Sequence, residues 1–252
     1  MNLSQLQPVE CLLADLYGAM LEGRGWSLAR VGDSEVLLMK CPTMKTDWKF
    51  YDTRITLASF PAVRERFVAS YQVADWTGVF MNDASAAAGF ELCGLGTPLQ
   101  QVYAWVNVHL PMYRDFVDLV LRRERLLLMG GLMAELAEKC LAPIRSLSDV
   151  EILDTALAHP LTMEDFEALC GRIASYSGRI VLISMSIWAK PLCAYAKSLG
   201  KIGIDFGNAA TFLLDGRIAL NADGLRGRRG YLDHYRKIAP FFNALHPKDS
   251  LV

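Results

Sequence analysis

Short apolar runs separated by glycines and polar turns recur along the chain, and they predict buried β-strands. Leu126–Met129, Ile180–Ile183 and Ile202–Phe206 are each almost continuously apolar. Strands buried on both faces of a parallel sheet have this pattern, whereas strands with one solvated face alternate apolar and polar residues. Two less uniform runs, over 27–31 and 76–81, predict further strands of the same sheet.

Between these runs, apolar residues recur at helical spacing. Helices are predicted over 8–22, from about 33 to Lys40, 59–71, a small-residue stretch after Asp83, 132–140, 162–175 and 188–199. Thr162 suits an N-cap, with acidic residues in the turn that follows. The order strand, helix, strand over 179–207 is typical of a right-handed crossover in a parallel sheet. The pattern predicts an α/β, Rossmann-like fold with a mostly parallel sheet flanked by helices.

The remaining segments are predicted to be loops and tails. Residues 41–51 mix aromatic and lysine side chains and are predicted to form a loop, and 94–98 is predicted to form a turn. Neither an internal repeat nor a low-complexity linker divides the 252 residues. We therefore expect a single domain over 1–252, with a core at 27–214 and a basic C-terminal extension at 215–252. That extension is a lid, a phosphate-contacting arm or a solvated basic segment.

Composition narrows the classes of partner. Hydrophobic residues make up 52% and charged residues 21% of the chain, and 26 basic against 27 acidic residues give a net charge of −1. That balance does not favour nucleic acid. Six scattered cysteines without a Cys-x-x-Cys pair are typical of reduced thiols, and no signal peptide or apolar run of transmembrane length is found. We expect a cytoplasmic protein and leave open whether it forms homo-oligomers.

Polar residues and glycines cluster where the predicted parallel strands end. The carboxyl ends of such strands are where α/β proteins bind ligands. Glycines after a strand also let a helix N-terminus approach phosphate, although the same turn serves plain architecture. The residues at these positions are Gly130, Gly131, Ser184, Ser186, Asp205, Gly207 and Asn208.

The turn after the first predicted strand carries two acids, Asp33 and Glu35, directly after Gly32. If the backbone stays extended there, side chains at i and i+2 point the same way and the two carboxylates converge. Such a pair suits Mg²⁺ or Mn²⁺. An ordinary helix N-terminus with acids in its first turn is the more common meaning of the same residues. Arg30 either contacts phosphate or braces the acidic turn from within the fold.

Two blocks of the sequence together resemble the GT-D-type glycosyltransferase domain. Ser27–Glu35 is similar to the family's opening segment, Ser-Leu-Ala-Arg-x-Gly-Asp-Gly-Glu. Val181–Ser184, Ala189-Lys190 and Ile204–Gly207 resemble its second block of strand, serine turn, helix start and strand end. The order of the blocks makes the resemblance far more specific than either block alone, and it covers most of residues 27–214.

The resemblance implies an enzyme that transfers a sugar from a nucleotide sugar, first of all a UDP-sugar, to a saccharide, lipid-linked or protein-linked acceptor. It implies that Asp33 and Glu35 bind a divalent cation, Mn²⁺ or Mg²⁺, beside the donor diphosphate. Asp205 joins them as a catalytic candidate, and Asp75 and Asp83 are further candidates for a base. The expected donor-binding residues are Arg30, Gly32, Ser34, Gly130, Gly131, Ser184, Ser186, Lys190, Gly207 and Asn208.

The chain departs from the family pattern at two positions. Ser34 stands between the acids where the family has glycine, and Asn208 stands where the family often has histidine. Both departures favour an alternative, a non-catalytic protein of the same fold that binds a sugar nucleotide or a partner protein. A methyltransferase or dehydrogenase is disfavoured, since no strand-anchored Gly-x-Gly-x-x-Gly is present.

Overall fold

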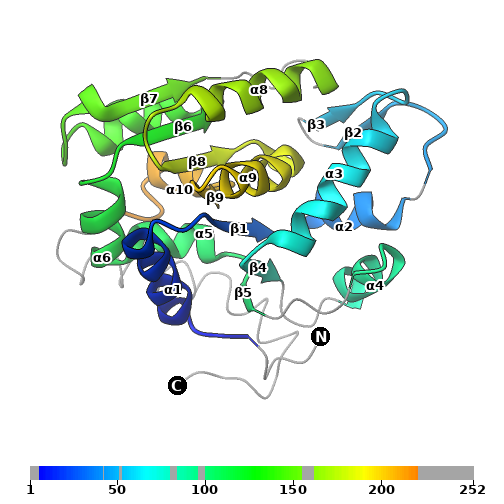
Figure 1. The fold of residues 1–252 in the computed structure, drawn as a ribbon, viewed down its shortest axis with the longest axis horizontal. Coiled ribbons are helices and arrows are strands. Elements are labelled where there is room, and N and C mark those ends of the chain that lie inside the picture. Colours follow the sequence, from blue (N-terminus) through cyan, green and yellow to red (C-terminus); the bar gives the residue numbers. More distant parts are fainter. Residues whose placement is uncertain are drawn as a thin grey trace.

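Seven parallel strands form one sheet in the order β5-β4-β1-β9-β8-β6-β7. The computed structural model describes residues 6–41, 43–50, 53–79, 84–95, 100–154 and 162–220. The strands of the sheet are β1 (Trp26–Arg30), β4 (Trp76–Val79), β5 (Gln101–Tyr103), β6 (Leu126–Gly130), β7 (Val150–Leu153), β8 (Ile180–Ser184) and β9 (Ile202–Asp205). The predicted Rossmann-like α/β class is confirmed, and every strand pair of this sheet is parallel (Figure 1).

Helices cover both faces of the sheet. Their bounds are α1 (Val9–Glu22), α2 (Asp33–Lys40), α3 (Phe60–Val73), α4 (Ala84–Leu92), α5 (Val106–His109), α6 (Arg114–Phe116), α7 (Met133–Leu136), α8 (Met163–Ser175), α9 (Ala189–Ser198) and α10 (Ala209–Leu214). Short 3₁₀ or π turns are η2 (Leu110–Met112), η3 (Val117–Leu121), η4 (Ala137–Leu141), η5 (Leu147–Asp149) and η6 (Ser186–Trp188). None of the helices among these residues combines the length and apolar character needed to cross a membrane.

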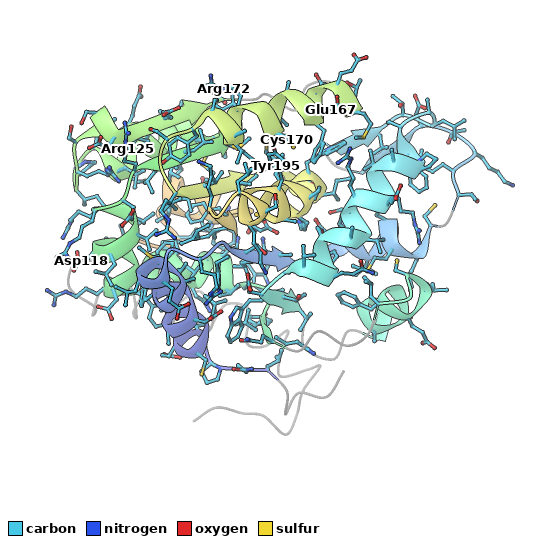
Figure 2. All side chains as sticks on the ribbon, viewed as in Figure 1. Asp118, Arg125, Glu167, Cys170, Arg172 and Tyr195 are labelled. Atoms are coloured by element: carbon cyan, nitrogen blue, oxygen red, sulfur yellow. The ribbon has the colours of Figure 1, made fainter. Side chains whose placement is uncertain are left out.

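Two hydrophobic cores lie on opposite faces of the sheet because strand side chains alternate. Leu126 and Leu128 of β6 enter one core, with α1, α5, α7 and α10. Leu127 enters the other, with α2, α3, α8 and α9. On this second face α9 lies between α3 and α8, and the labelled side chains Cys170 and Tyr195 lie where α8 and α9 meet (Figures 1 and 2).

Most predicted elements are present close to their expected bounds. The helix at 8–22 begins one residue later, with Pro8 as its N-cap. Thr162 caps α8, its hydroxyl accepting the N–H of Asp165 at 3.1 Å. The helix expected from Trp188 begins as a 3₁₀ turn, and that expected to reach Cys140 continues from α7 as a π turn.

Three features differ from the sequence expectations. The segment 41–51 is not wholly a loop, because β2 (Trp48–Phe50) pairs antiparallel with β3 (Thr53–Ile55). Two outer strands of the sheet, β5 and β7, were not predicted. β5 has only three residues, and the outer strand β7 has the half-exposed, charged sequence Val-Glu-Ile-Leu, so neither forms a continuous apolar run. The extension is described only as far as residue 220, so most of it lies outside the described residues.

Candidate active site

The carboxyl ends of β1, β9 and β8 meet at one edge of the sheet and bring together residues far apart in the sequence. Leu28 pairs with Ile204 and Ile183 pairs with Asp205, so the ends of these strands lie in register. Arg30, Ser184 and Asp205 therefore lie at the same edge, from which α2 begins (Figure 1).

The acidic turn after β1 is helical. Gly32 is the N-cap of α2, and Asp33 is its first residue. The hypothesis of an extended turn that points both acids the same way is therefore wrong, since residues two apart on a helix lie on different sides. The alternative of acids in the first turn of a helix is correct. The side chain of Asp33 lies outside what the structure describes.

Glu35 points inward and is 3% exposed. One of its oxygens, Oε2, accepts the Gly32 N–H at 2.9 Å and the Ser34 hydroxyl at 3.0 Å. A side chain at the third helical position that accepts the N-cap N–H satisfies one of the donors left open at a helix start. Gly32 suits the contact, because a Cβ there would lie 2.7 Å from Glu35 Oε2.

Lys190 at the start of α9 holds the other oxygen of Glu35. Its ammonium donates to Glu35 Oε1, lies 3.1 Å from Asp205 Oδ2 and donates to the Ser186 carbonyl at 3.0 Å. The side chains of Lys190 and Glu35 are each 4% exposed, and that of Asp205 is 1% exposed. The ammonium thus donates two hydrogen bonds and forms an ion pair with Asp205.

The charges of this buried group shift its pKa values. Burial alone would lower the pKa of Lys190 and raise that of Glu35, because a charged form is poorly solvated inside a protein. For Lys190, the carboxylates of Asp205 and Glu35 outweigh burial and raise its pKa above the usual 10.5. For Glu35, the charge and hydrogen bond of Lys190 outweigh burial and lower its pKa below the usual 4.5.

Arg30 completes the group at the end of β1. Its backbone N–H donates to Asp205 Oδ2 at 3.2 Å, and its Nη1 lies 3.9 Å from Asp205 Oδ1. Its Nε donates to the Ala104 carbonyl. The guanidinium packs against Gly207, where a Cβ would lie 2.0 Å from Nη1 and where φ is +47°. Two cations and two carboxylates thus lie together, and their formal charges cancel.

Asn107 belongs to the same edge, although the sequence analysis did not single it out. Its side chain is fully buried, and its Nδ2 donates to the Phe206 carbonyl at 2.9 Å and to Asn208 Oδ1 at 3.0 Å. The available signal was an amide within the apolar run 106–110, because a buried amide needs hydrogen-bond partners. Asn208 thus connects to the strand end through Asn107.

The remaining expected donor-binding residues are distributed along the same edge. The Ser184 hydroxyl donates to the Gly207 carbonyl. Gly130 has φ of +139°, and a Cβ there would lie 2.4 Å from the Ser184 carbonyl, so the close approach of β6 and β8 requires glycine. Gly131 follows β6 and is exposed, and Ser186 has φ of +49°.

The other two base candidates are not brought to this edge. Asp75 precedes β4 and so lies at the amino-terminal edge of the sheet. It accepts the Ser27 N–H at 2.9 Å and forms an ion pair with Lys197 at 2.8 Å. Asp83 lies outside the described residues.

Glu35 does not fit the role of a metal ligand. Three donors already engage its two oxygens, and the Lys190 ammonium occupies the space between Glu35 and Asp205. Among the residues whose side chains are described, no three His, Cys, Asp or Glu residues form a group that could hold a metal ion. Asp33 is outside this test.

Comparison with known protein families shows which family the chain belongs to. The family model of the GT-D fold-like domain matches residues 8–213. The chain belongs to the GT-D-like family. The match spans the whole central sheet and every residue of the site from Arg30 to Asn208, so the carboxyl-edge group lies inside the GT-D-like domain. No curated protein and no solved structure matches the chain.

Proposed function

We propose that this GT-D-like protein is a glycosyltransferase that moves a sugar from a nucleotide sugar to a saccharide, lipid-linked or protein-linked acceptor. Family membership supports a glycosyltransferase-type domain. The observation that carries the proposal is the Arg30 guanidinium, fixed at the carboxyl ends of the parallel strands where α/β proteins bind ligands.

Arg30 has donors left for an anionic ligand. Its Nε is used by Ala104, whereas its terminal nitrogens make no hydrogen bond to any described residue. Nη1 lies 3.9 Å from Asp205 Oδ1, which is too long for a hydrogen bond. The side chain is 11% exposed, so a ligand can reach it. A planar guanidinium matches two phosphate oxygens, which suits the diphosphate of a nucleotide sugar.

The N-terminus of α2 adds to this attraction. The first N–H groups of a helix lack acceptors within the helix, and the helix dipole favours negative charge there. In α2, Glu35 takes only the Gly32 N–H, and the next N–H groups belong to Asp33 and Ser34. A diphosphate at this edge would be held by Arg30 and by the backbone of the turn, as is common for phosphate at helix starts.

The contacts of Glu35 limit where a divalent cation could bind. We place the divalent cation that the resemblance implies, Mn²⁺ or Mg²⁺, at Asp33 and the ligand phosphates and not at Glu35. Such a cation supplies charge neutralisation to the leaving diphosphate. We assign Asp205 the role of a positioning residue, because its carboxylate is buried against Lys190 and Arg30.

Release of nucleoside diphosphate from a panel of nucleotide sugars tests the proposal. With Mn²⁺ and candidate acceptors, the full chain should release nucleoside diphosphate from one nucleotide sugar of the panel. Arg30→Gln should reduce the rate of this release at subsaturating donor. Arg179→Gln is the matched control, since Arg179 also donates to a backbone carbonyl, that of Met20 at 2.9 Å, but at the amino-terminal edge. Donor binding without turnover would favour the non-catalytic alternative, and absence of both would refute the proposal.

A further inference from the structure

Three oxygen atoms from three elements surround the Lys190 ammonium in the way that they would surround a metal ion. They are Glu35 Oε1 of α2, Asp205 Oδ2 of β9 and the carbonyl oxygen of Ser186. Two carboxylates and a backbone carbonyl are the ligand types that Mg²⁺, Mn²⁺ and Ca²⁺ prefer. In this protein the cation in the middle is a lysine side chain.

We propose that Lys190 is the built-in cation of this site and that it excludes a divalent ion from Glu35 and Asp205. The two carboxylates and the ammonium are each at most 4% exposed, so water screens them little. A divalent ion within bonding distance of Glu35 would lie next to the ammonium, and like charges at such separations repel strongly in a buried site. The metal and Lys190 therefore cannot occupy the site together.

The consequence for Glu35 is a positioning role. One oxygen of Glu35 is held by Lys190, while the other accepts the Gly32 N–H and the Ser34 hydroxyl. The ammonium thereby fixes the start of α2 relative to the end of β9. This inference concerns the charges alone and stands whether or not the protein transfers a sugar.

Mn²⁺ binding to the full-length protein, measured from the free-ion electron paramagnetic resonance signal, tests the exclusion. Glu35→Gln should change the Mn²⁺ affinity of the wild type by less than twofold. Lys190→Met should bind Mn²⁺ at least tenfold more tightly than the wild type, and Glu35→Gln in that background should abolish the gain. A tenfold loss of affinity in folded Glu35→Gln, or no gain in folded Lys190→Met, would overturn the proposal.

A measurement on the wild type covers the case in which Lys190→Met does not fold. The ¹H–¹⁵N signal of the buried Lys190 ammonium, identified by its absence from Lys190→Arg, should persist when millimolar Mg²⁺ is added. Loss of that signal on addition of Mg²⁺ would show that the ion replaces Lys190, and the proposal would be wrong.

Discussion

Lys190 on α9 and Glu35 on α2 form a buried ion pair across 155 positions of the sequence. Asp205 joins the pair from β9 at 3.1 Å from the ammonium. The three residues connect two helices on one face of the sheet to the end of a central strand. Glu35, the second acid of the Asp-x-Glu turn, is expected from the family resemblance to bind a metal ion. In the structure it is instead part of this buried group of charges.

Lys190→Met should destabilise the protein strongly. Removing one partner of a buried pair leaves uncompensated charge inside the protein and costs about 3–5 kcal/mol. The free energy of unfolding in urea measures this loss. Lys139→Met is the matched control, because Lys139 pairs with Glu135 at 2.6 Å on an exposed helix surface and should change stability little. Equal losses in the two variants would contradict the buried role of Lys190.

Glu35 should make stability depend on acid pH. Its folded pKa lies below the usual 4.5, so the folded protein binds fewer protons than the unfolded chain as the pH falls below that value. The stabilisation is fully present above pH 4.5 and is lost as the pH falls through the folded pKa. Urea unfolding of wild type and Glu35→Gln between neutral pH and pH 3 should show the two curves converging in acid, and parallel curves would contradict the lowered pKa.

Lys190 should add a loss of stability at the alkaline end. Its folded pKa lies above 10.5, so its contribution is complete below that value and is lost as the pH rises through the folded pKa. The difference in unfolding free energy between wild type and Lys190→Met should therefore not shrink as the pH rises from about 6 to about 9, a range that lies below the usual pKa of lysine. A difference that shrinks as the pH rises across this range would show that the ammonium loses its proton below the usual pKa of lysine.

Gly207→Ala should disturb the Arg30 guanidinium as well as the backbone. Both Gly207 and Gly216 have left-handed φ, +47° and +66°, at which any other residue costs roughly 1–2 kcal/mol. An added Cβ at Gly207 would lie 2.0 Å from Arg30 Nη1, whereas at Gly216 it meets nothing within 4 Å. Urea unfolding should show a larger loss for Gly207→Ala, and nucleoside diphosphate affinity should fall in that variant alone. Equal stability losses and equal affinities in the two alanine variants would show that the contact between Gly207 and Arg30 affects neither stability nor binding.

The sequence predicted much of the sheet because the central strands are apolar on both faces. It also predicted that Ser184, Asp205 and Gly207 share an edge, because parallel strands end on the same side. The charge partners were not predictable in the same way. Lys190 follows the apolar residues 187–189, and a buried lysine requires a partner, but nothing in the spacing identifies Glu35, which lies 155 positions away.

The choice between the two arrangements left open for the acidic turn has a specific physical origin. The sequence Gly32-Asp33-Ser34-Glu35 allows an extended turn as well as the more common helix start, and only the extended turn points both carboxylates the same way. The hydrophobic residues of α2 favour the helix, because the helical arrangement buries Val36, Leu38 and Met39 in the core beneath it. That packing turns Glu35 inward, toward Lys190.

Calorimetric titration of nucleoside diphosphates into the full-length protein tests most directly whether the carboxyl edge is a diphosphate site. In a panel of uridine, guanosine, adenosine and cytidine diphosphates, one of the four should bind the wild type. Arg30→Gln should weaken it by about 1.5–3 kcal/mol, the worth of a charged hydrogen bond, or roughly ten- to a hundredfold in Kd. Arg179→Gln should retain wild-type affinity. Absence of binding across the panel, or equal weakening in both variants, would contradict a diphosphate site at Arg30.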